Sequence, residues 1–379
     1  MGDRASLLRE AGERLQGAGS VEERKQRLNA FKDEAMLLAD MRRLLDPSFT
    51  LEAFSGSLAD LTEAVVEEAL VLARQDAQSA HGRPLRSDGS EAPFAAFGLG
   101  KFGGREMGYA SDVELLFAYE GPGTTERTGA DAGVFFEDLV RRFSDLIIAR
   151  EDGFFHVDLR LRPHGRKGPL ASPLALLRDY YRAGGDAHPF ERQALVKLRY
   201  AAGDETLGRE VERLRDAYVW SDEPFSLEEA LHLRDRQVRE LVPPGRFNVK
   251  LSPGGLVEVE YTAQYLQIEH GRDHPALRTP STLVALAGLV RAGLLTAEEH
   301  RDLREGYLFW RVVSDGLRMV RGAAHDLLLP ETGSVELRLL ARRLGYPGAD
   351  WGESAERLAD DVQHHRERIG AAFARRFRA

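Results

Sequence analysis

The sequence has no cysteine and no long apolar run, and each absence removes a class of function. Without cysteine there are no disulfides, thiolate zinc sites, iron–sulfur clusters or cysteine nucleophiles, and nothing opposes a reducing compartment. No stretch approaches the roughly 18 apolar residues of a membrane span, and the N-terminus lacks the apolar segment of a secretory signal. We therefore expect a cytoplasmic protein with no membrane partner.

Positive charge is also scarce, since 52 Lys and Arg face 61 Asp and Glu and give a net charge of −9. A dispersed acidic balance argues against a nucleic-acid partner, which needs a basic footprint. The remaining composition, with 43% hydrophobic and 30% charged residues, is ordinary for a folded protein. At roughly 100–200 residues per domain, a chain of 379 residues has room for two or three domains.

Helical periodicity dominates both ends of the chain. Residues 1–87 are expected to form an N-terminal helical segment, because apolar residues recur at helical spacing over 21–46 and 58–80. A linker with Gly, Pro and Ser follows. Residues 88–205 are expected to hold a sheet domain, and residues 206–379 a C-terminal helical bundle.

The pattern between the two helical regions is typical of strands. Short apolar runs at 94–99 and 113–119 and an alternating run at 154–161 predict three strands, with an amphipathic helix at about 132–150. The predicted fold class is therefore α+β, a small mixed sheet flanked by helices. One irregular loop, residues 242–255, interrupts the C-terminal helices; a loop this long inside a helical region is usually functional or a linker.

A glycine-rich segment, Gly98-Leu-Gly-Lys-Phe-Gly-Gly-Arg-Glu, follows the first predicted strand. Its start fits the dinucleotide-binding pattern G-x-G-x-x-G, but only residues 104–111 remain for a crossover that needs about a dozen helical residues. A phosphate-binding turn uses the whole segment, because glycines let backbone N–H groups approach an anion and nearby cations add charge. The candidate nucleotide-binding residues here are Lys101, Gly103, Gly104, Arg105 and Ser111.

Two carboxylates, Asp112 and Glu114, begin the next predicted strand. Alternation along a strand points both to one face, about 6.6 Å apart at about 3.3 Å per residue. That spacing suits two oxygen ligands of Mg²⁺, which keeps phosphate and water as its other ligands. Taken alone, the pair fits better as two surface acids at a solvated strand start.

A second polar cluster lies on the third predicted strand, where alternation places His156, Asp158, Arg160 and Arg162 on one face. The cation-rich turn at 163–169 follows. A carboxylate among arginines fits a third metal ligand, Asp158, with Arg160 and Arg162 as neighbours of a triphosphate. Three carboxylates on adjacent strands are the arrangement that metal-dependent nucleotidyl transfer requires.

Several motifs together resemble one protein family. G-K-F-G-G-R-E followed by S-D-V-E-L-L-F resembles the signature of the DNA polymerase beta-like nucleotidyltransferase superfamily. Within it, V-D-L-R-L-R-P-x-G-R-x-G-P-L (157–170), K-L-S-P-G-G-L-V-E-V-E-Y (250–261) and H-P-A-L-R-T-P-S-T-L (274–283) resemble the bacterial glutamine-synthetase adenylyltransferase/adenylyl-removing family. So does Y-L-F-W-R-V-V (307–313), and the resemblance covers about residues 94–330.

The resemblance implies transfer of AMP between ATP and a tyrosine hydroxyl of glutamine synthetase, or its phosphate-driven removal. It makes Asp112, Glu114 and Asp158 the catalytic, metal-binding carboxylates, and Gly103 and Gly104 the phosphate cradle. The family usually has D-x-D where this chain has Asp112-Val-Glu114, and it usually carries two transferase units where this chain has room for one.

Other residues and other functions stay open at this stage. Lys250 can reach a phosphate from the irregular loop, while Glu258 and Glu260 fit either a functional role or the favourable first turn of a helix. A nucleotidyltransferase with another protein or small-molecule substrate is one alternative, and a non-catalytic regulatory module is another. The retained carboxylates favour an enzyme.

Overall fold

The structure is a computed structural model that describes residues 2–149, 155–322 and 326–378. The chain divides into two compact units. The N-terminal unit comprises Met1–Met107, Ser111–Arg150 and Phe155–Ser221, and the C-terminal unit is mainly Asp222–Ala379. The helices of the first 87 residues thus pack in the same unit as the sheet. The predicted domain boundaries, after residues 87 and 205, stay predictions.

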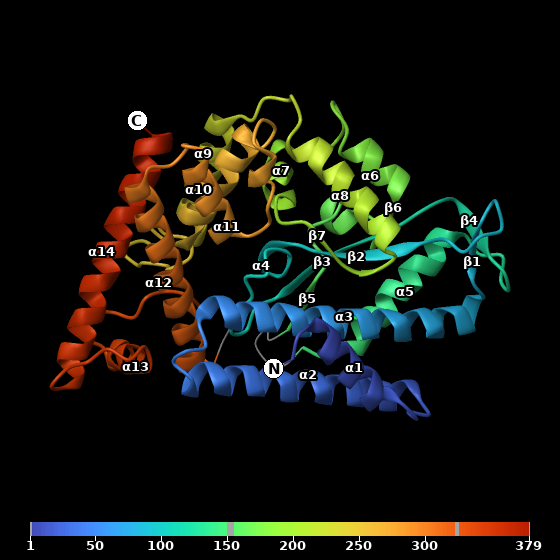
Figure 1. Cartoon of the computed structure of the whole chain (residues 1–379), viewed down its shortest axis with the longest axis horizontal. Helices are drawn as coiled ribbons and strands as arrows, with labels where there is room; N and C mark the ends of the chain where they lie inside the picture. Colours follow the sequence, from blue (N-terminus) through green and yellow to red (C-terminus); the bar gives the residue numbers. More distant parts are fainter. Residues whose placement is uncertain (1, 150–154, 323–325, 379) are drawn as a thin grey trace. The chain divides into compact units, whose positions relative to one another are not determined.

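A five-stranded mixed sheet organises the N-terminal unit, which confirms the predicted α+β class (Figure 1). The strand order is β5-β3-β2-β7, with β6 also paired to β3. Its strands are β2 (Phe94–Gly98), β3 (Val113–Tyr119), β5 (Val157–Asp158), β6 (Ala171–Pro173) and β7 (Arg199–Gly203). Strand β2 runs antiparallel to β3. The dinucleotide-binding unit, which needs two parallel strands, is therefore absent at this glycine turn.

Helices cover both faces of this sheet. Helices α3 (Leu51–His81) and α5 (Ala132–Leu146) pack together on one side, while α8 (Glu205–Val219) packs on β2 and β7 from the other (Figure 1). The strands are consequently buried almost throughout, and all seven residues of β3 except Glu114 are classed as buried. A two-stranded sheet, β1 (Pro84–Arg86) with β4 (Gly123–Thr125), lies at the end of the same unit.

The strands of the sheet differ from the sequence expectations in two ways. The third predicted strand is shorter, because β5 ends at Asp158 and the chain then turns; Phe154 and Arg150 of the predicted elements lie outside the described residues. The short strands β6 and β7 were not predicted, since both fall in a stretch with helical flanks.

Helix α2 (Val21–Leu45), which follows α1 (Arg4–Leu15), departs from its periodicity. Its Leu28 and Phe31 are buried, but five large apolar residues of its C-terminal half are exposed: Leu37, Leu38, Met41, Leu44 and Leu45.

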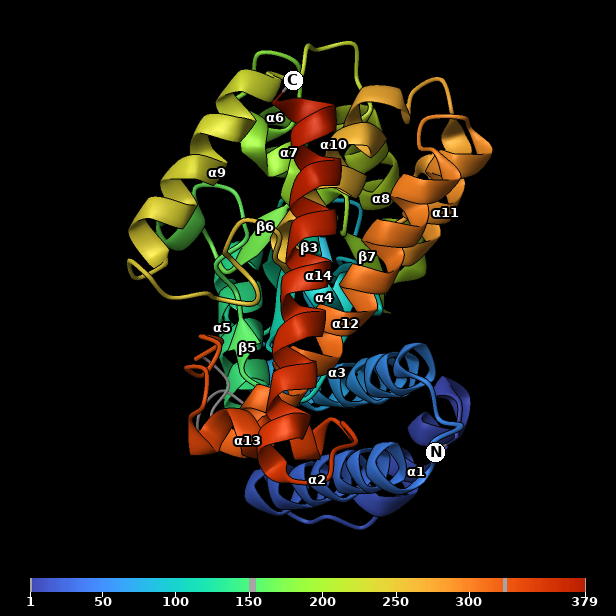
Figure 2. The same ribbon diagram turned by 90° about the vertical axis from the view of Figure 1, so that its left-hand side faces the viewer.

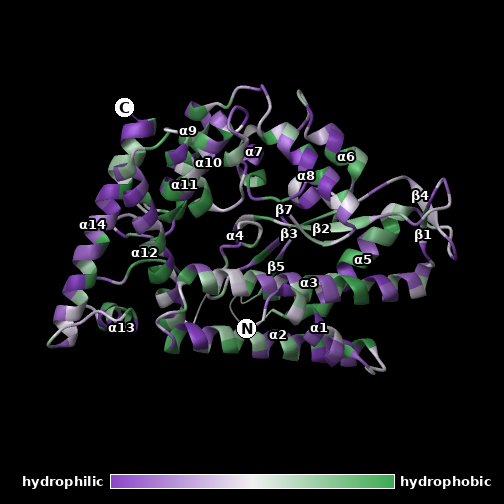
Figure 3. Cartoon of the chain, viewed as in Figure 1, coloured by the Kyte–Doolittle hydropathy of each residue, from purple (hydrophilic) through white to green (hydrophobic). Residues whose placement is uncertain are grey.

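Six long helices form the C-terminal unit, as expected from the sequence. They are α9 (Leu227–Leu241), α10 (Leu256–His270), α11 (Thr282–Arg291), α12 (Ala297–Arg321), α13 (Val335–Arg343) and α14 (Trp351–Phe377). Helix α12 begins with a capping box of Thr296 and Glu299, and α14 packs along it (Figure 2). Hydrophilic and hydrophobic residues alternate along α14 (Figure 3).

The buried side of these helices forms one core around Tyr265, Tyr307 and Trp310. Trp310 also donates its indole N–H to the carbonyl oxygen of Gly254, at 2.9 Å, and so fixes the end of the irregular loop. Among the described residues, no helix is long and apolar enough to cross a membrane.

Candidate functional site

Glycine is required by close packing at two positions of the turn after β2. The short helix α4 (Gly100–Gly103) starts there. Gly100 has φ +50, and a Cβ at this position would overlap the carboxylate of Glu114. A Cβ on Gly103 would overlap the carbonyl oxygen of Lys197. Both glycines are therefore needed for the fold itself, whatever ligand the turn binds.

Glu114 and Asp158 lie directly opposite each other on the parallel strands β3 and β5. Residues paired across two strands point to the same face of the sheet, so both side chains leave it on one face. Asp112 precedes Glu114 by two residues and lies 3.8 Å from Nδ1 of His156, the residue that begins the approach to β5. The structure thus brings the three predicted carboxylates to one edge of the sheet.

Asp158 is nearly enclosed, with a side chain 6% exposed, and Arg160 holds it. The backbone N–H and Nε of Arg160 both donate to Oδ1 at 2.9 Å, and Nη2 donates to Oδ2 at 2.6 Å. Burial would raise the pKa of Asp158, but the hydrogen bonds and charge of Arg160 outweigh it and lower this pKa below its usual value. Asp158 is therefore ionised at neutral pH.

Arg160 is the counter-ion of the acidic cluster. Its pKa is raised by the hydrogen bond to Asp158, then by the charge of that residue, with smaller contributions from Asp112 and Glu114. The alternation predicted for this segment was wrong beyond Asp158. Because β5 ends there, Arg160 reaches Asp158 through a turn of the backbone and not along a continuing strand.

Arg162 faces its own loop. Its Nε donates to the carbonyl oxygen of Gly168 at 3.2 Å, and its other nitrogens bind the carbonyls of Leu159 and Arg166. Desolvation lowers the pKa of this guanidinium. These bonds shape the cation-rich turn, so the structure gives Arg162 a supporting role there; its contact with phosphate stays a prediction.

These residues are of the type that binds a metal ion, but their side chains are not grouped closely enough to surround one. Carboxylate oxygens are what Mg²⁺ prefers. However, within the described ranges no three Asp, Glu or His side chains are close enough together to hold a metal ion. The cluster is held instead by Arg160, on the side where Asp158 meets Glu114.

The other predicted nucleotide-binding residues are placed differently. Arg105 turns its guanidinium to α3, where Nη2 lies 2.7 Å from Oδ1 of Asp60 and Nη1 lies 2.9 Å from Oε1 of Glu63. Ser111 is buried, and Lys101 is half-buried on α4. Gly104 ends α4, and its N–H donates to the carbonyl oxygen of Gly100 at 3.0 Å. The charge of Arg105 is thus committed to α3, and its phosphate contact stays a prediction.

Lys250, Glu258 and Glu260 belong to the C-terminal unit. Glu258 is buried there, where Oε2 accepts the N–H of Gly254 at 2.8 Å and Oε1 lies 3.5 Å from Nη2 of Arg234. Burial raises the pKa of Glu258, against the hydrogen bond from Gly254 and the charge of Arg234. These contacts favour its structural reading. The relation of all three residues to the carboxylate cluster stays a prediction.

The comparisons with known proteins agree with the resemblance noted in the sequence. The pattern of the family described as glutamate–ammonia ligase adenylyltransferase matches residues 3–214, more than half of the chain. The chain belongs to this family. Residues 227–377 match a second pattern, described as GlnD PII-uridylyltransferase.

Named relatives extend the match over most of the chain. Each is called a bifunctional glutamine synthetase adenylyltransferase/adenylyl-removing enzyme. The relative from Streptomyces avermitilis is 34% identical over 86% of this chain and 32% of its own length. Those from Burkholderia mallei and Thioalkalivibrio sulfidiphilus are 31% and 32% identical, over 84% and 98% of this chain and 35% and 38% of their own lengths. The chain spans about a third of the length of these relatives.

Two buried charges beside the turn were missed by the sequence reasoning. Lys197 and Glu106 form an ion pair in which each side chain is 7% exposed. Glu106 was visible only as part of the G-K-F-G-G-R-E motif, and Lys197 lies 91 residues away from it. No spacing signal connects them, because their contact depends on how β7 enters the sheet beside α4.

Proposed function

We propose that this chain is a Mg²⁺-dependent nucleotidyltransferase unit that moves AMP between ATP and a tyrosine hydroxyl of glutamine synthetase. The observation that carries the proposal is the pairing of Glu114 with Asp158, with Asp112 two residues before Glu114, in a chain of this family. The phosphate-driven removal of AMP from the same tyrosine is a related adenylyl transfer, in which phosphate attacks the tyrosine-bound AMP and ADP is released, whereas transfer from ATP releases pyrophosphate. A cytoplasmic location belongs to the same proposal.

Asp112, Glu114 and Asp158 would hold the metal. Bound Mg²⁺ polarises a phosphoryl oxygen and lowers the pKa of an attacking hydroxyl. The carboxylates supply oxygen ligands, and the lowered pKa of Asp158 keeps this ligand ionised. In the proposed state Asp158, which now binds Arg160, would be a ligand of the cation.

Arg160 then serves the nucleotide. Its side chain is 64% exposed, so its guanidinium can leave Asp158 without losing a buried environment. A guanidinium at this place offsets negative charge on the transferring phosphoryl group. The turn at Gly103 and Gly104, with Lys101 beside it, is proposed to lie against the remaining phosphates. Glycine allows their close approach, while the N–H groups of Gly103 and Gly104 stay bonded to the carbonyl oxygens of Leu99 and Gly100. Lys250 is proposed as a further phosphate contact.

One observation favours a second function, that of a regulatory module that keeps the fold without transferring AMP. Both carboxylate oxygens of Asp158 already accept hydrogen bonds from Arg160, and Glu114 occupies a position where the family usually has Asp. If the salt bridge does not open, no cation enters. A third reading keeps the chemistry and changes the acceptor, to another protein or a small molecule.

Label transfer from ATP tests these readings. The protein is incubated with Mg²⁺, ATP labelled at the α-phosphate, and glutamine synthetase, with a parallel reaction in EDTA. We expect label on glutamine synthetase only with Mg²⁺. The removal of AMP is measured as release of labelled ADP when phosphate is added to glutamine synthetase that carries labelled AMP.

The controls separate the three readings. Label that appears on a different acceptor in the absence of glutamine synthetase supports the third reading. Protein that binds no MgATP in calorimetry and transfers no label under any of these conditions supports the regulatory module and contradicts the proposal.

A further inference from the structure

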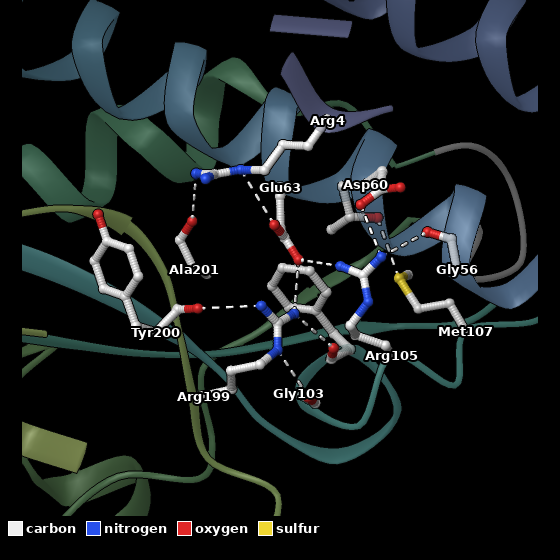
Figure 4. Close-up of polar contacts among 12 residues, drawn as sticks. Arg4, Gly56, Asp60, Glu63, Gly103, Arg105, Met107, Arg199, Tyr200 and Ala201 are labelled. Atoms are coloured by element: carbon white, nitrogen blue, oxygen red, sulfur yellow. Dashed lines mark hydrogen bonds and ion pairs between the residues drawn. The ribbon is translucent and has the colours of Figure 1, made fainter. Parts of the chain in front are cut away.

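One buried carboxylate on α3, that of Glu63, joins three arginines (Figure 4). Its Oε1 lies 2.9 Å from Nη1 of Arg105 and 2.8 Å from Nη2 of Arg199. Its Oε2 lies 3.1 Å from Nε of Arg4, and the Glu63 side chain is only 6% exposed. Removing one partner from such a sheltered cluster leaves buried charge uncompensated, so the cluster is not easily rearranged.

Arg199 connects Glu63 to the end of α4. Its Nε donates to the carbonyl oxygen of Gly103 at 3.0 Å, and its Nη2 to that of Phe102 at 3.4 Å. Its guanidinium also lies 5.8 Å from the centre of the Phe102 ring. The last carbonyls of a helix have no partners within the helix. Arg199 therefore supplies a donor to the Gly103 carbonyl and a second donor to that of Phe102, which also accepts the N–H of Arg105, from a side chain that Glu63 holds in place.

Arg105 connects Glu63 to the residue that follows the glycine pair. It has φ 56, in the left-handed region that side chains other than glycine rarely adopt. In this conformation its guanidinium reaches Glu63 and also Asp60, whose Oδ1 lies 2.7 Å from Nη2. The ion pairs compensate an unfavourable backbone, and in return the backbone after α4 is fixed to α3.

The start of α4 is fixed by Glu114, through both its backbone carbonyl and its carboxylate. The N–H of Leu99 donates to the carbonyl oxygen of Glu114 at 2.9 Å, and the Glu114 carboxylate lies against Gly100. A helix of one turn is not stable alone. Its position relative to Glu114 is thus set from two ends, by β3 at Gly100 and by Glu63 at Gly103 and Arg105.

From this geometry we infer that Glu63 is a positioning residue for nucleotide binding. It touches no substrate in the proposed reaction, but it holds α4 and the glycine turn in place beside Glu114, where the proposed function puts the phosphates of ATP. The identity of the ligand rests on the proposed function; the bracing of the turn does not. Arg105, predicted as a phosphate contact, instead fixes the backbone after α4 to α3 in this inference.

The test compares Glu63→Gln with Glu68→Gln. Glu68 is a half-buried carboxylate on the same helix that lies beside Gly12 of α1. Amide hydrogen exchange over residues 99–107 and the calorimetric Kd for MgATP are measured in the full chain. Glu63→Gln should speed exchange over 99–107 and raise the Kd about tenfold or more, because a displacement of about 1 Å at a site can cost about 100-fold.

The matched control, Glu68→Gln, should leave both quantities at their wild-type values, and Glu63→Asp should give an intermediate Kd. If Glu63→Gln does not fold, Arg199→Gln replaces it, since Glu63 then keeps two of its arginines. Unchanged exchange and unchanged Kd in the variant, with or without a lower Tm, would overturn the inference. If the wild type binds no MgATP, the proposed function fails, while exchange over 99–107 still decides whether Glu63 fixes the turn.

Discussion

Glu114 and Asp158 occupy paired positions on neighbouring parallel strands, and the Asp158 carboxylate accepts side-chain hydrogen bonds from Arg160. The pairing puts two carboxylates on one face, and the arginine neutralises them while no cation does. The structure shows these three groups as an internal salt bridge, and the proposed function requires that the carboxylates exchange it for a cation. Most of the testable consequences of the proposal follow from this exchange.

Asp158→Asn removes a full negative charge and keeps the size of the side chain. We expect AMP transfer to fall about 100-fold or more, as for loss of a group that acts in the transition state. Asp179→Asn, on the exposed side of α6 (Leu174–Tyr180), is the matched control and should transfer AMP like the wild type. If Asp158 serves only to bind Arg160, the change will lower Tm and leave turnover per folded molecule unchanged.

The acid stability of the N-terminal unit should depend on Arg160. The pKa of Asp158 is lowered in the folded chain, so its stabilisation is present above its unfolded pKa and is lost as pH falls through the lower, folded value. In Arg160→Gln the burial remains while the compensating charge is gone, and the folded pKa must rise. We expect acid unfolding, followed by circular dichroism, to begin at higher pH in Arg160→Gln than in the wild type.

Arg178→Gln is the control for that experiment, because Arg178 pairs with the surface residue Glu210 on the same unit. Its acid unfolding should match the wild type. Equal acid limbs for Arg160→Gln and the wild type would mean that the salt bridge to Asp158 is not maintained in solution.

Glu258 should behave as a structural residue of the C-terminal unit. Its carboxylate binds the N–H of Gly254 and faces the fully buried guanidinium of Arg234. Loss of one partner of a buried ion pair costs about 3–5 kcal/mol, and glutamine keeps part of the hydrogen bonding, so we expect Glu258→Gln to lower the free energy of unfolding by about 1–3 kcal/mol. Chemical denaturation measures this loss, and the KM for ATP should not change.

Lys250→Ala should show the opposite behaviour. Lys250 is half-buried in the irregular loop and is proposed to contact phosphate, so its loss should raise the KM for ATP several-fold with little change in unfolding. Lys167→Ala, in the cation-rich turn of the N-terminal unit, tests whether any surface lysine has the same effect. A KM that is unaltered in Lys250→Ala returns the loop over 242–255 to a linker role.

What could be predicted from sequence followed local signals. The apolar run at 113–119 became β3 with the same bounds, and both acids before and within it were identified, because alternation is a property of a single strand. The end of β5 could not be predicted, since Arg160 turns back to Asp158 only once both are placed beside β3. Helical periodicity also predicts that Leu37 and Leu38 lie on the buried face of α2. Both are exposed, because no described neighbour in their unit covers that face.

Glu63 shows the same limit from the opposite side. In the apolar run of α3 an acid is expected on the solvent face, and its burial depends on arginines at positions 4, 105 and 199. Those residues are brought together by α1, the turn after α4 and β7, which only the tertiary fold places side by side. Contacts of this length in sequence leave no spacing signal.

Glu114→Asp separates the proposed function from its rivals most directly, because it restores the D-x-D pattern usual in the family. The carboxylate of Glu114 now rests against Gly100, which has no side chain to oppose it. Aspartate is one methylene shorter and would withdraw from that contact toward the strand and toward Asp158. Since Mg²⁺ requires ligands at about 2.0–2.1 Å in near-octahedral geometry, the change should alter the Mg²⁺ concentration needed for half-maximal rate.

If the chain is an attenuated enzyme, Glu114→Asp should raise the initial rate of AMP transfer or lower the Mg²⁺ requirement. If α4 has adapted to glutamate through Gly100, the shorter side chain should fall short and the rate should drop. Initial rates across a Mg²⁺ series for both forms distinguish these outcomes, and Glu120→Asp, a half-buried acid directly after β3, controls for a general effect of shortening an acid. Rates that are measurable and identical at every Mg²⁺ concentration would remove Glu114 from the metal site, because a ligand shortened by a methylene cannot hold the cation unchanged.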